Sequence, residues 1–341
     1  MEDGTDASAA GRRGRHIPHP TRPPALTTWG NTGIFMNHSD IRERPAGLRT
    51  LDSPQAMNPP ALTCLPVPRC QLGENPLWHG GSQCLYWTDI EAGRIHRFHP
   101  ASGTHEVIYQ GIPVGGFTFQ AAGDLLLFRV GDLALLHPDG GVEVLRAFTD
   151  AGLVRFNDVI ADPEGRVFAG TIGTTDQSGG LYRIDPDGTI TALWRGTGCS
   201  NGMGFSPDLK TFYWTCSTRR RIHQYDYDRA TGALGPARLF HQAIPEEGIP
   251  DGLAVDQHGH VWSARWDGGA VVRHDPSGRI VDTIQLPVPK VASLCFGGTK
   301  LDKIYITTAG GRHDADGMEG AVFQFEPAAA GRHEFESRLR R

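Results

Sequence analysis

Paired hairpins recur along the sequence and predict an all-β fold, a six-bladed β-propeller. Six stretches each contain an apolar run, a turn rich in Asp, Pro and Gly, and a second apolar or aromatic run. Their starts lie about 40 to 50 residues apart, the period of a four-stranded propeller blade. A second hairpin follows each stretch, and the sixth lacks its return strand. A β-sandwich or a β-helix would explain the hairpins but not two of them per repeat.

In chain order, the first hairpins are Pro76–Asp89, Phe117–Arg129, Val159–Thr171, Met203–Thr215, Leu253–Arg265 and Leu294–Thr308. The last repeat ends at VFQFEP without a return strand. We expect Ala61–Val67 to supply the missing strand. Pairing the two ends of the chain would close the ring and leave only short edges.

The flanking segments differ from the repeats. Residues 1–57 are rich in Gly, Pro and Arg without sustained periodicity, which predicts a disordered extension. Met57 directly precedes the first ordered-looking segment and raises the hypothesis that the natural start lies there. Residues 58–330 are assigned to the propeller, and residues 331–341 to a flexible C-terminal tail.

The composition of the chain limits the classes of binding partner that we expect. A net charge of −5 gives no electrostatic basis for binding nucleic acid or an anionic membrane. There is no apolar run of about 18 residues and no signal-peptide pattern. The six cysteines include no CxxC pair, and the fifteen histidines include no HExxH pattern. We expect reduced thiols and a cytoplasmic protein, as a monomer or a small homo-oligomer.

Polar residues precede the first strand of four repeats. If that strand is innermost, Glu74, Asn157, Asn201 and Asp251 converge at one mouth of the central channel. Each alone is more often an ordinary turn residue, and only their recurrence at equivalent positions favours a site. Two carboxylates and two amides, with a charge of about −2, suit a hard divalent cation. The sequence thus predicts a central metal site with open positions, as catalysis requires.

The segments GENPLW, RFNDVIADPEGRVFAGT, SNGMGFSPDLKTFYWT and IPDGLAVDQHGHVWSARWDGG resemble the SMP-30/gluconolactonase/LRE family, over about residues 65–327. The resemblance implies a six-bladed propeller that binds one divalent cation in its channel and hydrolyses aldonolactones. It implies the same four metal ligands. It also implies that Arg155 contacts the substrate, next to Asn157.

The sequence departs from the family in the loop after Gly170. A substrate-contacting glutamate is expected there, but the loop offers only Asp176 and Gln177, which leaves the choice of sugar open. The loop Ala309–Gly320 is a second candidate for the pocket rim, with Arg312 and His313. Asp158 has no assigned role.

The expected reaction is hydrolysis of a sugar lactone. The cation would polarise the carbonyl, and Asp251 would act as general base toward the attacking water. A metal-bound hydroxide is the alternative to Asp251. Calcium is the first expectation, with zinc, manganese or magnesium as alternatives. Two other functions remain open: phosphotriester hydrolysis at the same site, and calcium binding without catalysis.

Overall fold

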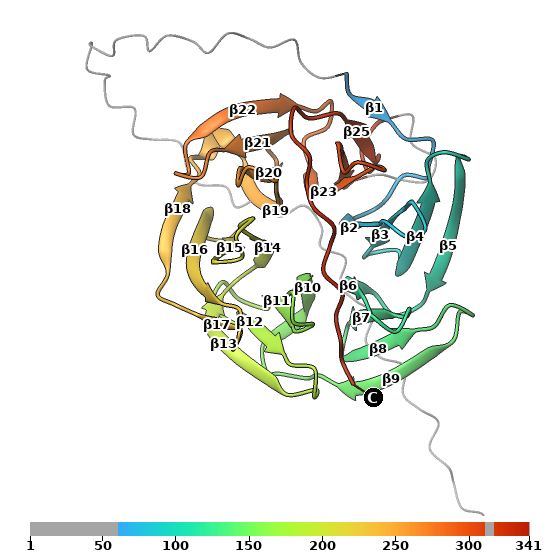
Figure 1. The fold of residues 1–341 in the computed structure, drawn as a ribbon, viewed down its shortest axis with the longest axis vertical. Helices are drawn as coiled ribbons and strands as arrows, with labels where there is room; N and C mark the ends of the chain where they lie inside the picture. Colours follow the sequence, from blue (N-terminus) through green and yellow to red (C-terminus); the bar gives the residue numbers. More distant parts are fainter. Residues whose placement is uncertain (1–60, 311–316, 341) are drawn as a thin grey trace, which may run out of the picture. The chain divides into compact units, whose positions relative to one another are not determined.

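The protein is built from six antiparallel sheets arranged around one axis (Figure 1). A computed structural model describes residues 61–310 and 317–340. The six-bladed β-propeller predicted from the repeats is confirmed. The predicted N-terminal extension, residues 1–57, lies outside the described residues.

The first three blades follow the predicted repeats, each with four strands in chain order from the axis outward. Blade 1 comprises β2 (Gly73–His79), β3 (Cys84–Asp89), β4 (Arg94–His99) and β5 (Thr104–Gln110). Blade 2 comprises β6 (Val114–Phe119), β7 (Leu125–Arg129), β8 (Asp132–Leu136) and β9 (Val142–Ala147). Blade 3 comprises β10 (Leu153–Ala161), β11 (Val167–Gly173), β12 (Gly179–Ile184) and β13 (Ile190–Thr197).

The remaining blades vary at their outer strands. Blade 4 comprises β14 (Ser200–Phe205), β15 (Thr211–Cys216) and β16 (Arg221–Asp228), and β17 (Ala233–Leu234) and β18 (Arg238–Gln242) both pair with β16. A short 3₁₀ helix, Pro245–Glu247, leads into blade 5 with β19 (Ile249–Val255), β20 (Val261–Trp266), β21 (Ala270–His274) and β22 (Ile280–Gln285). Blade 6 comprises β23 (Val291–Gly297), β24 (Lys303–Thr308), β25 (Phe323–Phe325) and β1 (Thr63–Cys64).

The ring closes as the incomplete last repeat predicts. Thr63 pairs with Gln324 and Cys64 with Phe323, so the beginning of the described chain supplies the outer strand of blade 6. The backbone nitrogen of Leu65 extends the contact by donating to Val322 O at 2.8 Å. Around the axis, each first strand contacts the first strands of both neighbours, in the cycle β2, β6, β10, β14, β19, β23 and back to β2.

Apolar side chains between neighbouring blades hold the ring together. Six buried clusters correspond to the six blade interfaces. At the interface of blades 1 and 6, for example, Trp78 and Tyr305 stack with ring centroids 5.6 Å apart. Outer strands such as β9 are largely exposed, because they have only one neighbouring strand. Burial thus decreases from the channel outward, which leaves the channel as the best-protected place for polar chemistry.

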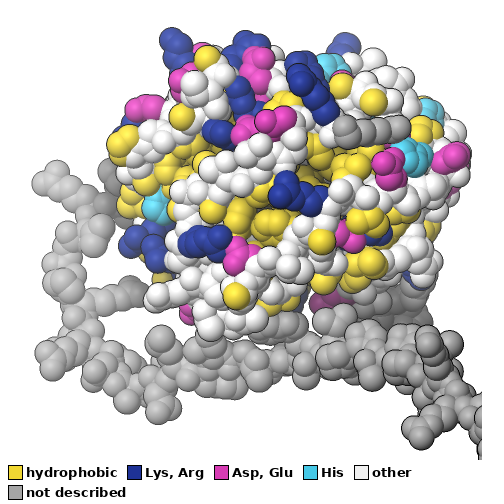
Figure 2. Space-filling model, turned by 90° about the horizontal axis from the view of Figure 1, so that it is seen from below, with side chains coloured by type: hydrophobic (Ala, Val, Ile, Leu, Met, Phe, Trp, Pro, Cys, Tyr) yellow, Lys and Arg dark blue, Asp and Glu magenta, His cyan; other side chains and the backbone are white. Residues whose placement is uncertain are grey.

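The outer surface carries charges of both signs. On the face shown in Figure 2, acidic and basic side chains are interspersed, with apolar side chains between them. Within the described residues, no helix has the length and apolar character needed to cross a membrane. All six cysteines are unpaired, and Cys216 and Cys295 are buried as small core residues.

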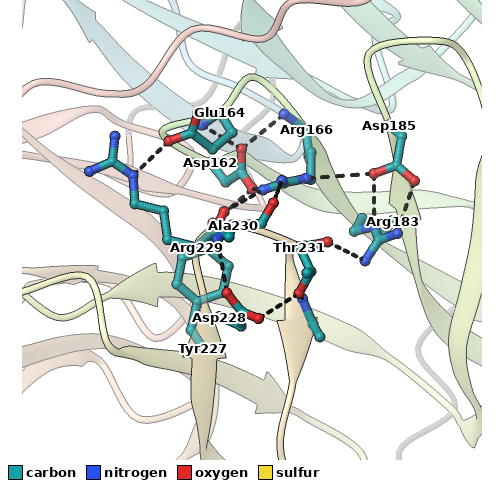
Figure 3. A network of polar contacts seen from close by, with 11 residues as sticks. Asp162, Glu164, Arg166, Arg183, Asp185, Tyr227, Asp228, Arg229, Ala230 and Thr231 are labelled. Atoms are coloured by element: carbon teal, nitrogen blue, oxygen red, sulfur yellow. Dashed lines mark hydrogen bonds and ion pairs between the residues drawn. The ribbon is translucent and has the colours of Figure 1, made fainter.

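A polar network joins blade 3 to the β16–β17 turn of blade 4 (Figure 3). Fully buried Asp162 accepts hydrogen bonds from Arg166 Nη1 at 2.7 Å and from the hydroxyl of Tyr227 at 2.8 Å. Arg166 also donates to the backbone oxygens of Arg229 and Ala230. These bonds satisfy a buried carboxylate and fasten two blades at the end of β10.

The C-terminal residues lie across the propeller rather than beside it. The sequence predicts a flexible tail over residues 331–341, whereas the structure places residues 331–340 against several blades (Figure 1). Ser337 is fully buried. Leu339 packs against the apolar cluster between blades 2 and 3, and Phe335 against the one between blades 3 and 4. The sequence of residues 331–341 predicts a tail because it is short and rich in charge. Its apolar side chains contact residues that are distant in the sequence, so no local pattern indicates that they are packed.

Candidate active site

The first strands place the predicted ligands at one mouth of the channel. In blades 1, 3, 4 and 5 the first strand advances three residues while its partner advances two, which is a β-bulge. Asn157, Asn201 and Asp251 are each the first residue inside their bulge. Bulges interrupt the alternation of a strand and re-aim side chains, often beside active sites.

Blade 1 has the same bulge, but the predicted ligand lies one residue before it. Glu74 still pairs with Thr88, and the first residue inside the bulge is Asn75, which has a φ of 46°. The side-chain oxygen of Asn75 accepts a hydrogen bond from Phe117 N at 2.7 Å. Asn75 therefore fastens blade 1 to blade 2, and Glu74 is the blade 1 side chain at the site.

The four predicted ligands are all buried, with exposed fractions of 3–4%. Three of their oxygens, Glu74 Oε2, Asn201 Oδ1 and Asp251 Oδ1, have no hydrogen-bond partner within the described residues. An unpaired buried oxygen costs free energy unless a ligand or water satisfies it. Hard oxygen donors from three different blades are the donor set that a divalent cation prefers. The residues present therefore fit a cation.

The charges of these groups act on one another. Burial raises the pKa of Glu74 well above its ordinary range, and the negative charges of Asp251 and Asp158 add to the effect. Burial, together with the charge of Asp158, likewise raises the pKa of Asp251. Arg155 opposes both shifts. Three carboxyl groups thus share one desolvated region, where a positive charge would stabilise their ionised forms.

Arg155 reaches the mouth from the same strand as Asn157. Its Nη1 donates to Asn157 Oδ1 at 2.6 Å and to Phe156 O at 2.9 Å. Burial lowers the pKa of Arg155, and the neighbouring acidic groups counteract this. The guanidinium is half-buried, and within the described residues only Nη1 makes hydrogen bonds. Its remaining N–H groups suit a ligand oxygen.

Two residues without a predicted role belong to the same mouth. Asp158 is 7% exposed, and its Oδ1 has no hydrogen-bond partner within the described residues. Burial raises the pKa of Asp158 to about 7, against the opposing charge of Arg155. Cys199 is half-buried, and its Sγ lies 3.8 Å from Asn157 Nδ2 and 3.7 Å from Asn201 Nδ2. In the sequence, the one indication of a role for Asp158 and Cys199 is their position: Asp158 directly follows Asn157, and Cys199 lies two residues before Asn201.

The channel continues inward from the mouth as a cavity of about 60 Å³. Asn75 and Asp158 line it, as do Arg332 and Glu334 of the C-terminal segment. Such a volume has room for a few water molecules but not for a sugar. A substrate of sugar size must therefore bind at the mouth.

The predicted rim loops have different outcomes. Asp176 and Gln177 are exposed, and the backbone of Asp176 lies beside Gly198, next to Cys199, so this loop borders the mouth. Arg312 and His313 lie outside the described residues.

A separate buried group lies within blade 1 and its leading segment. Ligand atoms of Cys70, Asp89 and His96 lie within 4.8 Å of one another. Asp89, however, accepts the backbone N–H groups of Gln71 and Leu72 at 3.0 Å. Burial raises the pKa of the Cys70 thiol, and Trp87 Nε1 donates to its sulfur at 3.2 Å. These bonds explain the cluster as an internal anchor of the blade.

A closed six-bladed propeller with unpaired buried oxygens at one channel mouth defines a class of protein, the β-propellers with a candidate cation site on the axis. Within that class, the chain belongs to the SMP-30/Gluconolactonase/LRE-like family, whose model matches residues 72–310. The predicted family membership is confirmed.

Several relatives cover most of the chain. Pentonolactonase XacC of Haloferax volcanii is 43% identical over 284 residues, which are 80% of this chain and 96% of the relative. Regucalcin of Gallus gallus is 33% identical over 280 residues, which are 79% of this chain and 92% of the relative. A solved regucalcin from Agrobacterium tumefaciens, described as a calcium-binding protein, superimposes with a TM-score of 0.77 at 27% identity, covering 82% of this chain and 98% of that one.

Proposed function

We propose that this chain is a sugar lactonase that depends on a divalent cation held at the channel mouth. The observation that carries the proposal is the convergence of Glu74 Oε2, Asn201 Oδ1 and Asp251 Oδ1, which are buried without hydrogen-bond partners in the described residues. The similarity to a pentonolactonase supports a lactone substrate, and a five-carbon aldonolactone is the first candidate.

The residues divide into holding and reacting groups. Glu74, Asn201 and Asp251 would hold the cation through their unpaired oxygens, and Asn157 through Oδ1. The similarity to a regucalcin described as calcium-binding supports calcium, and the oxygen donors also accept zinc, manganese or magnesium. When bound, the cation supplies polarisation of the lactone carbonyl.

Proton transfer is assigned to Asp251. Its buried carboxylate belongs to the proposed cation site and can accept the proton of the attacking water. As the bond from the carbonyl carbon to the ring oxygen breaks, Asp251 returns that proton to the ring oxygen. The product is one open-chain hydroxy acid, and the Asp251 carboxylate is regenerated.

Arg155 binds the substrate. Its half-buried guanidinium is fixed through Nη1, and its other N–H groups can donate to lactone or hydroxyl oxygens at the mouth. The hydrogen bond to Asn157 keeps the Arg155 side chain beside the site before substrate arrives.

A pH-indicator assay tests the proposal. The protein is freed of metal with a chelator, and calcium, zinc, manganese or magnesium is added back separately. Each sample is assayed on pentono- and hexonolactones and on a phosphotriester. We expect cation-dependent hydrolysis of at least one lactone. Hydrolysis of the phosphotriester alone, or cation binding without any turnover, would contradict the proposal and favour the corresponding alternative.

A variant pair locates the site. Asp251→Ala should lose at least about 100-fold in turnover because it removes both a cation ligand and the base. Asp282→Ala is the matched control, since Asp282 lies on the outermost strand of the same blade. If folded Asp251→Ala retains wild-type turnover, Asp251 is not the catalytic residue.

A further inference from the structure

Cys199 stands between the two amide ligands of the proposed cation site. Its sulfur accepts N–H groups from Asn157 and Asn201, at 3.8 and 3.7 Å. Its backbone is fixed as well, because Cys199 forms an isolated bridge with Ile172 and its oxygen accepts Ser217 N at 3.1 Å. The sulfur is therefore held at the junction of blades 3 and 4.

The second N–H of each amide also has a partner. Asn157 Nδ2 donates to Ser200 O at 2.9 Å, and Asn201 Nδ2 donates to Ser217 Oγ at 3.1 Å. The Ser217 hydroxyl is held in turn by donating to Pro250 O at 2.7 Å. A side-chain amide has two N–H donors, so these acceptors can engage both donors of each amide.

These bonds, together with the one from Arg155 Nη1 to Asn157 Oδ1, decide which way each amide faces. If either amide were rotated by half a turn, its oxygen would face the sulfur and a second acceptor, and both bonds would be lost. In the observed orientation Asn201 Oδ1, on a side chain only 4% exposed, has no hydrogen-bond partner among the described residues. That unpaired oxygen indicates that the orientation serves a ligand.

We propose that Cys199 is a positioning residue, which turns the oxygens of Asn157 and Asn201 toward the cation by accepting their N–H groups. This role rests on the proposed cation site. Sulfur accepts hydrogen bonds at longer distances than oxygen does, so one cysteine can serve both amides. An alanine at this position would offer no acceptor.

Calorimetric titration of the metal-free protein with calcium tests the role without relying on activity. We expect Cys199→Ala to weaken calcium binding about tenfold, and Cys199→Ser, which keeps an acceptor, to stay within about threefold of the wild type. Cys64→Ala, which removes a half-buried thiol from the outer strand of blade 6, is the control and should leave the affinity unchanged.

The outcomes separate the two ideas. If the wild type binds none of calcium, zinc, manganese and magnesium in parallel titrations, the cation site fails and the role of Cys199 fails with it. If the wild type binds calcium and Cys199→Ala binds it equally well, the positioning role alone is overturned. Equal weakening in Cys199→Ala and Cys199→Ser also overturns it, because the effect would then not depend on an acceptor.

A different observation concerns the far end of the channel. The C-terminal strap, residues 330–340, crosses the ends of the first strands opposite the mouth (Figure 1). Ala330 O accepts Gln257 N of blade 5, Gly331 N donates to Leu301 O of blade 6, and the Arg332 guanidinium donates to the backbone oxygens of Phe205 and Ser206 of blade 4.

The second half of the strap binds the other side of the ring. Ser337 exchanges backbone hydrogen bonds with blade 2, to Phe119 O at 2.8 Å and from Ala121 N at 2.9 Å, and its hydroxyl lies 2.8 Å from Thr118 Oγ1. Arg338 N and Arg340 N donate to two turns of blade 3, at Gly165 O and Pro186 O.

We infer that the strap is an intramolecular clasp, which closes the ring a second time and makes the channel blind at its far end. The pairing of β1 with β25 joins only blade 6 to the start of the chain, whereas the strap ties five blades across the axis. Because Arg332 and Glu334 of the strap line the inner cavity, we expect solutes to reach it from the acidic mouth.

Hydrogen exchange and thermal unfolding test the clasp. We expect slow exchange at the backbone amides of Ser337, Arg338 and Arg340, and a melting temperature lowered by about 5–10 °C when residues 331–341 are deleted. Ser337→Ala should lower it by about 2–4 °C, while Glu336→Ala, at an exposed neighbouring position, should not. Unprotected amides, or a deletion that leaves the melting temperature unchanged, would show a free tail and overturn the inference.

Discussion

Asp158→Asn should remove much of the pH dependence of stability in the metal-free protein. Burial raises the pKa of Asp158 from an ordinary 3.8 to about 7, so the folded protein holds this proton more tightly than the unfolded chain. Below about pH 4 both states are protonated and the stabilisation is fully present. It is lost as the pH rises through about 7, because the folded state must then keep an ionised, buried carboxylate.

The size follows from the two pKa values. About three pH units at about 1.4 kcal/mol each give a loss of about 4 kcal/mol between pH 4 and pH 8, as an upper limit for one group. The asparagine side chain has nearly the same shape and no charge to bury. Between pH 4 and pH 8, the free energy of unfolding of Asp158→Asn should therefore fall by several kcal/mol less than that of the wild type.

Urea unfolding followed by tryptophan fluorescence, in chelator at pH 5 and pH 8, measures the effect. Glu74 and Asp251 remain in the variant, so some pH dependence should persist. Glu91→Gln, which alters an exposed carboxyl group of blade 1, is the control and should keep the wild-type dependence. An Asp158→Asn variant whose stability falls as steeply as the wild type would refute the assignment of a buried, destabilised carboxylate to this position.

Three further changes test the architecture of the mouth and of the blade contacts. Gly202→Ala should cost several kcal/mol or prevent folding, because a Cβ there would lie 2.3 Å from a backbone nitrogen of blade 5; a soluble variant with wild-type thermal stability would contradict the close approach. Ser200→Ala should cost about 1–3 kcal/mol, since it leaves the buried indole N–H of Trp214 without its 2.7 Å acceptor; an unchanged urea midpoint would argue against that bond. Tyr227→Phe should cost about 1 kcal/mol through the lost bond to Asp162, as measured by urea unfolding. No loss would mean that the remaining bonds from Arg166 and the Glu164 backbone satisfy the carboxylate.

The architecture follows from local patterns. Apolar runs and Asp-Pro-x-Gly turns depend on neighbours close in the sequence, so the repeats predict the blades. The missing return strand predicts that Ala61–Val67 closes the ring, and within that segment Thr63–Cys64 does so. Recurrence also predicts Asn157, Asn201 and Asp251, because equivalent positions in equivalent blades face the same axis, and Glu74 lies one residue before the equivalent position in blade 1.

Other features depend on contacts that no local pattern records. The bulges that turn Asn157 and Asp158 into the channel arise from register with a partner strand, so Asp158 had no readable role. Cys199 lies between two amides because blades 3 and 4 meet there, although Cys199 and Asn157 are 42 residues apart in the sequence. The hydroxyl groups of Ser337 and Thr118 share a hydrogen bond, although the two residues are 219 positions apart in the sequence. The sequence by itself determined the blades and predicted the candidate ligand positions. Only the tertiary structure decided how the amides are oriented and where the C-terminal residues bind, because burial and hydrogen bonding are properties of the assembled ring.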